Sequence, residues 1–256
     1  MKRLLGCLLL VGVVGCGDRD LDALKNLGAT IQTSPNGDIS IKLKDTPITN
    51  ADLEHLKGLK TLRSLSLINT QITDAGLEQI KNLTTLSYLY LNDTQITDAG
   101  LEQIKSLTNL SYLYLNDTPI TDAGLEHLKG LPKLARLHLN GTQITDQGLE
   151  QLNQVTSLEL AGTPITDAGL EQLKEQPAFE WLHLSNTKVT DAGLKHLEGL
   201  TKLTYLNLSK TTITDDGLEH LKKLTNLTVL FINSTKVTDA GVAELKTTLP
   251  NCKILK

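Results

Sequence analysis

The chain has 256 residues, of which 21% are charged and 39% are hydrophobic, and its formal net charge is −4. Proteins that bind nucleic acids present a clustered basic face. This mildly acidic chain has no run of Lys or Arg, so a nucleic-acid partner is not expected.

The first 16 residues have the pattern of a secretion signal. A short basic segment at 1–3 precedes an apolar run at 4–14 that is too short to cross a bilayer as a helix. The run ends in Val-Val-Gly-Cys, which resembles the lipobox of bacterial lipoproteins. That resemblance implies removal of residues 1–15, lipidation of Cys16, and anchoring in a bacterial cell envelope. Because Gly17 follows the cysteine, the resemblance favours sorting of the protein to the outer membrane over the inner membrane. An ordinary secreted protein and an uncleaved anchor are the alternatives.

A short helix and a hairpin are expected next. Asp20–Leu27 has helical character, and two apolar stretches, Ala29–Thr33 and Asp38–Leu43, flank the turn-forming sequence Ser-Pro-Asn-Gly. We expect this hairpin to cap the first core face. The predicted division of the chain is a signal peptide at 1–15, a tether with helix and capping hairpin at 16–43, and a repeat domain at 44–256.

One phrase, Thr-x-Ile-Thr-Asp-Ala-Gly-Leu and its variants, recurs nine times through the rest of the chain. Its leading threonine lies at positions 46, 70, 94, 118, 142, 163, 187, 211 and 235. Every step is 24 residues except the step from 142 to 163, which is 21. A fixed period of this size is typical of a stacked-repeat solenoid. In the short repeat three residues of return loop are missing, so we expect a tighter loop and a local change of curvature there.

Each repeat reads as a strand followed by a short helix. In the copy at 86–107, Leu89 and Leu91 alternate with polar and aromatic residues, as in a strand with one buried face. Apolar residues then recur every third position from Leu101, which suits a helix or 3₁₀ segment. Thr97 is a suitable N-cap, and Asp98 places negative charge on the first helical turn.

The pattern Leu-x-x-Leu-x-Leu-x-x-Thr-x-Ile resembles the leucine-rich repeat. Its second half, Ile-Thr-Asp-x-Gly-Leu, resembles the cysteine-containing subclass and, more closely, bacterial 24-residue versions. The resemblance implies an α/β solenoid, a horseshoe with parallel strands on the concave face and short helices on the convex face. The family usually has Asn or Cys where this chain has Thr94 and its equivalents. We expect a buried threonine ladder whose hydroxyls bond to the backbone of the next turn.

The aromatic residues are the strongest functional indication. Phe179 occupies a core position, and the other seven lie at the two outward positions of the strands. Rigid amphipathic rings are typical of recognition surfaces. The predicted partner-binding residues are Tyr88, Tyr90, Tyr112, Tyr114, Arg136, His138, Glu159, Trp181, His183, Tyr205 and Phe231. The alternative is that aromatic residues favour strands and that duplication copied one pair.

Three of these residues, His138, Glu159 and His183, fall in successive repeats of one column, about 4.8 Å apart. Two imidazoles and a carboxylate suit a metal, but a fourth ligand is not evident, so a polar patch is the favoured interpretation. By contrast, His55, His127, His196 and His220 alternate with glutamine at one helix position, which indicates a solvated face without chemistry.

Little in the sequence indicates catalysis, and an enzyme or metal protein at His138, Glu159 and His183 is the least favoured hypothesis. The chain has no glycine-rich phosphate loop, His-Glu-x-x-His motif or nucleophile elbow, so no enzyme activity and no cofactor are expected. Of the three cysteines, Cys7 lies in the signal and Cys252 falls at a core position, so no intramolecular disulfide is expected.

The sequence therefore predicts a non-catalytic binding module anchored in the envelope, which recognises an unidentified protein through its concave face. A binder of envelope carbohydrate that uses the same rings, and a structural spacer without a specific ligand, are the alternatives.

Overall fold

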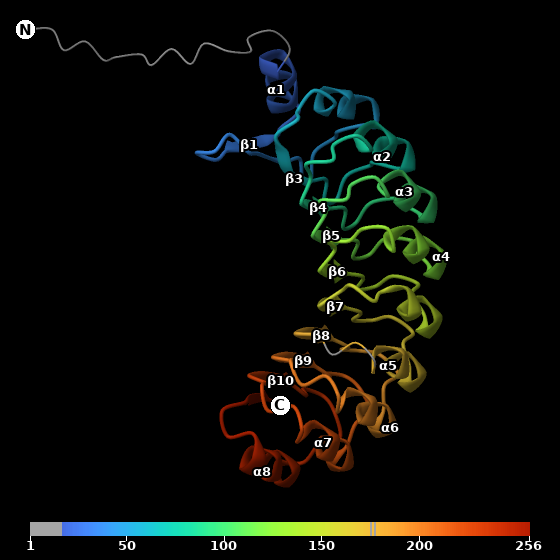
Figure 1. Ribbon diagram of the computed structural model, residues 1–256, viewed down its shortest axis with the longest axis vertical. Helices are drawn as coiled ribbons and strands as arrows, with labels where there is room; N and C mark the ends of the chain where they lie inside the picture. The colour runs from blue at the N-terminus through green and yellow to red at the C-terminus, as the bar shows by residue number, and fades with distance from the viewer. Residues whose placement is uncertain (1–16, 175, 177) are drawn as a thin grey trace, which may run out of the picture.

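The computed structural model describes residues 17–174, 176 and 178–256, and it is a curved solenoid. The strands line the inner side of the arc and the helices line the outer side (Figure 1). All of the strands belong to one sheet and follow each other in chain order. Among the described strands, only β1 and β2 pair antiparallel, and every later pair is parallel. The predicted leucine-rich-repeat horseshoe is therefore confirmed.

The strands of this sheet are β1 (Thr30–Thr33), β2 (Ile39–Lys42), β3 (Leu62–Ser66), β4 (Tyr88–Tyr90), β5 (Tyr112–Tyr114), β6 (Arg136–His138), β7 (Ser157–Glu159), β8 (Trp181–His183), β9 (Tyr205–Asn207), β10 (Val229–Phe231) and β11 (Lys253–Leu255). The α-helices are α1 (Gly17–Asn26), α2 (Asp74–Ile80), α3 (Asp98–Gln103), α4 (Asp122–Leu125), α5 (Asp167–Leu173), α6 (Asp191–Leu194), α7 (Asp215–Leu221) and α8 (Asp239–Thr248). The 3₁₀ segments are η1 (Ala51–Leu56), η2 (Glu126–Leu128), η3 (Asp146–Gln151) and η4 (Lys195–Leu197).

The core is a continuous column of leucine and isoleucine between the sheet and the helices. In the repeat that begins at Leu86, the residues expected to be buried are fully so, from Leu89 in the strand and Leu91 directly after it to Leu101 in the helix. The predicted core positions of Phe179 and Cys252 are also confirmed, with exposed fractions of 0% and 4%. One repeat alone could not bury this surface, so neighbouring repeats stabilise each other.

The threonine ladder is present, but its hydrogen bonds differ from the prediction. The Thr94 side chain is buried, as are those of its equivalents from Thr70 to Thr211. Its hydroxyl donates to the carbonyl of Leu91 at 2.6 Å, three residues earlier in the same repeat. The prediction of a bond to the next turn was wrong, because the turn after the strand returns this carbonyl to within reach of the hydroxyl.

A second ladder connects each repeat to the next, and the sequence reading missed it. The Thr121 N–H donates to Asp98 Oδ1 at 2.9 Å, and the Thr121 hydroxyl donates to Asp98 Oδ2 at 2.6 Å. Thr97 likewise donates both groups to Asp74, and it makes no side-chain capping bond to its own helix. The aspartate was predicted to act on its own first turn. Its principal partner is instead the threonine one repeat later.

This ladder explains the glycine of the repeated Asp-Ala-Gly sequence. At Gly169, a methyl group would lie 2.5 Å from Asp146 Oδ1, the atom that accepts the hydrogen bond from the Thr166 N–H. The glycines at 100, 124, 148, 193, 217 and 241 are crowded by the equivalent carboxylate. The helix therefore approaches the preceding repeat closely only because this position has no side chain.

At its two ends the ladder uses substitute partners. Thr49 has no aspartate one repeat earlier, and its N–H and hydroxyl donate instead to Asp52 of its own repeat at 2.8 and 2.6 Å. The Thr49 hydroxyl and N–H hold the pKa of Asp52 below its usual value. At the other end, Asp239 has no later threonine partner among the described residues, and Lys256 Nζ lies 2.6 Å from its carboxylate.

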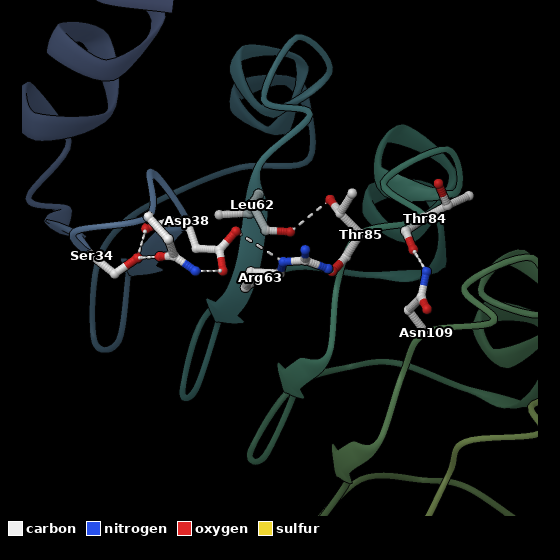
Figure 2. A network of polar contacts seen from close by, with 8 residues as sticks. Ser34, Asp38, Leu62, Arg63, Thr84, Thr85 and Asn109 are labelled. Atoms are coloured by element: carbon white, nitrogen blue, oxygen red, sulfur yellow. Dashed lines mark hydrogen bonds and ion pairs between the residues drawn. The ribbon is translucent and has the colours of Figure 1, made fainter.

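The N-terminal hairpin is attached to the first repeats by a polar network (Figure 2). Arg63 Nε donates to Asp38 Oδ1 at 3.0 Å, and Arg63 Nη1 donates to the Thr85 carbonyl at 3.2 Å. Asn36 in the hairpin turn donates to the other Asp38 oxygen at 2.9 Å. One arginine thus holds together the hairpin, β3 and the loop before β4.

Two of the four helix-position histidines are not merely solvated, contrary to the prediction. His55 Nδ1 lies 3.0 Å from Asp20 Oδ1 and links η1 to α1, and His220 Nδ1 lies 2.7 Å from Glu198 Oε1 of the preceding repeat. Both side chains are about one-third exposed. Each of these two histidines therefore contacts an acidic side chain of a neighbouring segment.

In the short repeat the convex segment is the 3₁₀ helix η3, and the Gln154 amide donates to the Leu128 carbonyl at 3.1 Å across the shortened loop. The predicted change of curvature stays a prediction. The predicted signal peptide and the lipidation residue Cys16 lie outside the described residues. Within the described part of the chain, no helix has the length and apolar character needed to cross a bilayer.

Candidate functional site

The concave face carries two parallel columns of outward side chains, one from the first residue and one from the third residue of each short strand. The first column contains Tyr88, Tyr112, Arg136, Ser157, Trp181 and Tyr205. The second contains Tyr90, Tyr114, His138, Glu159, His183, Asn207 and Phe231. All eleven predicted site residues therefore lie on one surface.

In the N-terminal half of this face the rings stack along the columns. Tyr88 and Tyr112 are stacked with centroids 4.4 Å apart, and Tyr90 and Tyr114 are stacked at 4.5 Å. The Arg136 guanidinium lies 5.1 Å from the Tyr112 ring centroid, which is within cation–π distance. The stacked rings hold one another in place, so the face is ordered before any partner arrives.

The second column continues from the rings into a polar group. His138 Nδ1 lies 3.2 Å from Glu159 Oε2, His183 Nδ1 lies 3.9 Å from the same oxygen, and the Asn140 amide donates to it at 2.7 Å. Burial alone would raise the pKa of Glu159, but these three partners outweigh it, and the pKa lies well below the usual range. Glu159 is therefore an ionised carboxylate held between two imidazoles.

The hydrogen-bonding roles of the two His183 ring nitrogens follow from its other neighbours. Asn207 Oδ1 accepts a bond from the Ser209 N–H at 2.9 Å, so the Asn207 amide nitrogen must face His183 Nε2, at 3.0 Å. An amide nitrogen only donates. Nε2 therefore accepts, and the proton of the neutral ring lies on Nδ1, toward Glu159. The Ser185 hydroxyl also lies 2.8 Å from Nε2, so both ring nitrogens of His183 have polar neighbours.

A second aromatic group occupies the C-terminal half. Trp181 and Tyr205 are stacked with centroids 3.4 Å apart and nearly parallel rings, and Phe231 lies tilted against Tyr205 at 5.5 Å. Ser157 separates this group from Arg136 in the first column. Tyr88 and Trp181 are the large hydrophobic residues most exposed on the described surface, each at 37%.

The arrangement gives little support to chemistry at this face. The two imidazole nitrogens nearest Glu159 point to its carboxylate rather than to a shared external position. Among the described residues, no group of three His, Cys, Asp or Glu side chains is placed to hold a metal ion. What the face offers is a surface of rings, one guanidinium and a polar centre.

The sequence reading missed a hollow beside the tyrosines. It measures about 310 Å³ and is lined by Lys42, Lys44, Ser64, Ser66, Ile68 and Tyr90. The signal was available: Ser64 and Ser66 lie 24 residues before Tyr88 and Tyr90, so the first full repeat has small residues where the next two have rings. A search for large side chains does not find a site made by small ones.

Comparisons with known proteins agree with the geometry. Models of the leucine-rich repeat match residues 84–144 and 177–237, and a second repeat model matches residues 58–81 and 153–174. The chain is a leucine-rich-repeat protein. Such proteins generally mediate protein–protein interaction and are typically non-catalytic.

Solved leucine-rich-repeat structures are similar to this one. Internalin C2 from Listeria monocytogenes is 27% identical with a TM-score of 0.62, and the alignment covers 94% of this chain and 91% of that one. The structure of PEPR1-AtPEP1 is 16% identical with a TM-score of 0.53, covering 88% of this chain and 36% of that one, and it supports the fold alone. No curated protein sequence matches the chain.

Proposed function

We propose that this chain is a non-catalytic module of a bacterial cell envelope that binds a protein partner through the concave face. The observation that carries the proposal is the alignment of the predicted residues into two columns with Tyr88 and Trp181 still exposed. Ordered aromatic rings and an arginine contribute most of the binding energy in many protein interfaces.

The stacking favours a protein over a carbohydrate as the partner. Sugars bind to aromatic residues over the face of the ring, and within each stacked pair one face of each ring is covered by the other ring, which leaves fewer ring faces for a sugar. The ring edges and phenol groups remain available along the columns. Burial raises the pKa of Tyr90 and Tyr114, so both phenols stay neutral hydrogen-bonding groups.

Site-specific photocrosslinking tests this proposal. A photoreactive benzoylphenylalanine replaces Tyr112 on the concave face in one variant and Gln103 on the convex side in the control, and both proteins are illuminated in intact cells. We expect a discrete protein adduct from position 112 and none from 103. Adducts from 103 alone, or from neither position, would remove the concave face as the protein-binding surface, and the second result would favour the spacer.

The envelope anchor is a separate part of the proposal and rests on the lipobox-like sequence before Cys16. Lipidation adds two or more acyl chains, enough for stable membrane attachment. We expect the wild-type protein to partition into the detergent phase and Cys16→Ser to stay in the aqueous phase. Equal partitioning of the two proteins would refute the anchor, without bearing on the binding face.

A further inference from the structure

The hollow beside the tyrosines follows from the register of the first strands. Lys42 in β2 pairs with Ser66 in β3, which pairs with Tyr90 in β4. Successive strands lie about 4.8 Å apart, so the lysine and the ring stand roughly 10 Å apart across a row of serines. A flat group against the ring needs about 3.5–4 Å, which leaves room for it beside the lysine stem.

One wall of the hollow is an uncovered aromatic face. Tyr114 covers one face of the Tyr90 ring. On the other side the neighbour is Ser66, which is too short to cover the ring, and Tyr88 has the same relation to Ser64. These are the first rings of their columns. This end of the stacks, unlike their interior, offers a ring face to a ligand.

The opposite wall is basic. Lys42 forms no ion pair within the described part of the chain, and Lys44 approaches only Asp45 Oδ2, at 3.8 Å. Both lysines are exposed. The chain as a whole has a net charge of −4, so the positive charge of this wall is opposite in sign to the net charge of the protein. Its position is fixed, because the Arg63 network holds the hairpin that carries Lys42 against β3 (Figure 2).

We infer that this hollow is a binding subsite for an acidic side chain of the protein partner, next to an aromatic or aliphatic one. The carboxylate binds between Lys42 and Lys44, and the apolar group lies on the free face of Tyr90 above Ser66. This inference rests on the proposed function for the kind of partner. It extends the binding face by one repeat beyond the tyrosines.

A minimal probe tests the chemistry without the partner. 3-Phenylpropanoate has a ring and a carboxylate, 3-phenylpropan-1-ol has the ring alone, and glucuronate has the carboxylate on a sugar. Each is titrated into ¹⁵N-labelled protein while the backbone amide shifts are followed. We expect saturable shifts at Ser64, Ser66 and Ile68 with 3-phenylpropanoate, and at least about fivefold weaker binding of the alcohol.

The variants separate charge from shape. Lys42→Gln/Lys44→Gln should weaken 3-phenylpropanoate binding about fivefold or more, because two exposed ion pairs are lost. Lys57→Gln/Lys60→Gln changes the net charge equally at exposed lysines outside the hollow and should have no effect. Ser64→Tyr extends the tyrosine column into the hollow and should abolish binding. The amide spectrum of each variant reports whether it is folded.

The outcomes are distinct. The absence of a saturable shift at Ser64, Ser66 and Ile68 overturns the subsite. An equal loss of 3-phenylpropanoate binding in Lys42→Gln/Lys44→Gln and Lys57→Gln/Lys60→Gln also overturns it. Tighter binding of glucuronate than of 3-phenylpropanoate replaces the acidic peptide by an acidic sugar and also overturns it. If the Tyr112 crosslink persists unchanged in Lys42→Gln/Lys44→Gln, the subsite fails and the proposed function stands. If the probe binds but no concave crosslink forms, the proposed function fails instead.

Discussion

Asp146, Thr166 and Gly169 provide the sharpest test of the ladder between repeats. The Thr166 N–H and hydroxyl donate to the two Asp146 oxygens at 2.8 and 2.6 Å, and a methyl group on Gly169 would stand 2.5 Å from Asp146 Oδ1. The same carboxylate thus makes the bonds and excludes the side chain. The perturbations are Asp146→Ala, Gly169→Ala and the double variant.

The magnitudes follow from these contacts. Hydrogen bonds to a charged group contribute about 1.5–3 kcal/mol each, but this carboxylate is only half-buried and water replaces part of the loss. We therefore expect Asp146→Ala to destabilise the fold by about 2 kcal/mol. Gly169→Ala gains roughly 0.5–1 kcal/mol of helix propensity, and the overpacking against the carboxylate costs about 1–3 kcal/mol.

The double variant removes the cause of the crowding. The next nearest neighbours of a methyl group at 169 are Ile165 Cγ2 and Leu149 Cδ1, at 3.1 and 3.2 Å, and small shifts of these two side chains accommodate the methyl group. We expect Gly169→Ala to be destabilising in the wild-type background and close to neutral in the Asp146→Ala background. The difference is a coupling of about 1–2 kcal/mol between residues in direct contact.

Urea unfolding followed by circular dichroism measures all four free energies. Asp146→Asn is a useful control, because the first rung of the ladder already has Asn50 in this role and keeps two bonds to Thr73. It should cost less than Asp146→Ala. If Gly169→Ala has the same effect in both backgrounds, the carboxylate is not what requires glycine and the reasoning fails.

Further predictions concern single buried or paired groups. Thr118→Val removes the hydroxyl that donates to Leu115 at 2.6 Å and should destabilise the fold by about 1 kcal/mol in urea unfolding; no measurable change would contradict the ladder's contribution. Burial raises the pKa of Cys252 to about 11, so in a chain whose other two cysteines are serine we expect no thiol labelling at pH 8 until urea unfolds it; prompt labelling in water would be inconsistent with its buried site. The folded pKa of Glu159 is lowered, so its stabilisation is present above the unfolded value of about 4.5 and is lost as the pH falls below it. The stability difference between the wild type and Glu159→Gln should therefore be smaller at about pH 3 than at about pH 5, and a difference that keeps growing below about pH 4.5 would reverse this assignment.

The sequence was sufficient for the fold because the pattern repeats. The alternation around Leu89 and the three-residue spacing after Leu101 recur from repeat to repeat, and each recurrence supports the same strand and helix. The 24-residue period of the sequence also aligns Tyr88 with Tyr112. Periodicity fixes which residues are neighbours across strands, and that was enough to place the candidate face.

The contacts between repeats were less accessible. Asp98 reads locally as a helix-starting residue, and its partner Thr121 is 23 residues away. A single repeat contains no sign that its aspartate and the next threonine meet, since this depends on how closely two helices stack. The threonine hydroxyls and the hollow near Ser66 have the same explanation, because both depend on where the backbone and its neighbours lie rather than on residue type.

The ladder between repeats has a direction, since each repeat offers a carboxylate forward and a threonine backward. Every interior repeat is therefore equivalent at its junctions, and a copied or deleted unit leaves the same pair of groups facing each other. The 21-residue repeat illustrates this tolerance, because Asp146 still reaches Thr166 across 20 residues instead of 23. Such a chain can gain or lose whole repeats while the contacts at each junction stay the same. An added repeat therefore extends the binding surface without a change in the existing core.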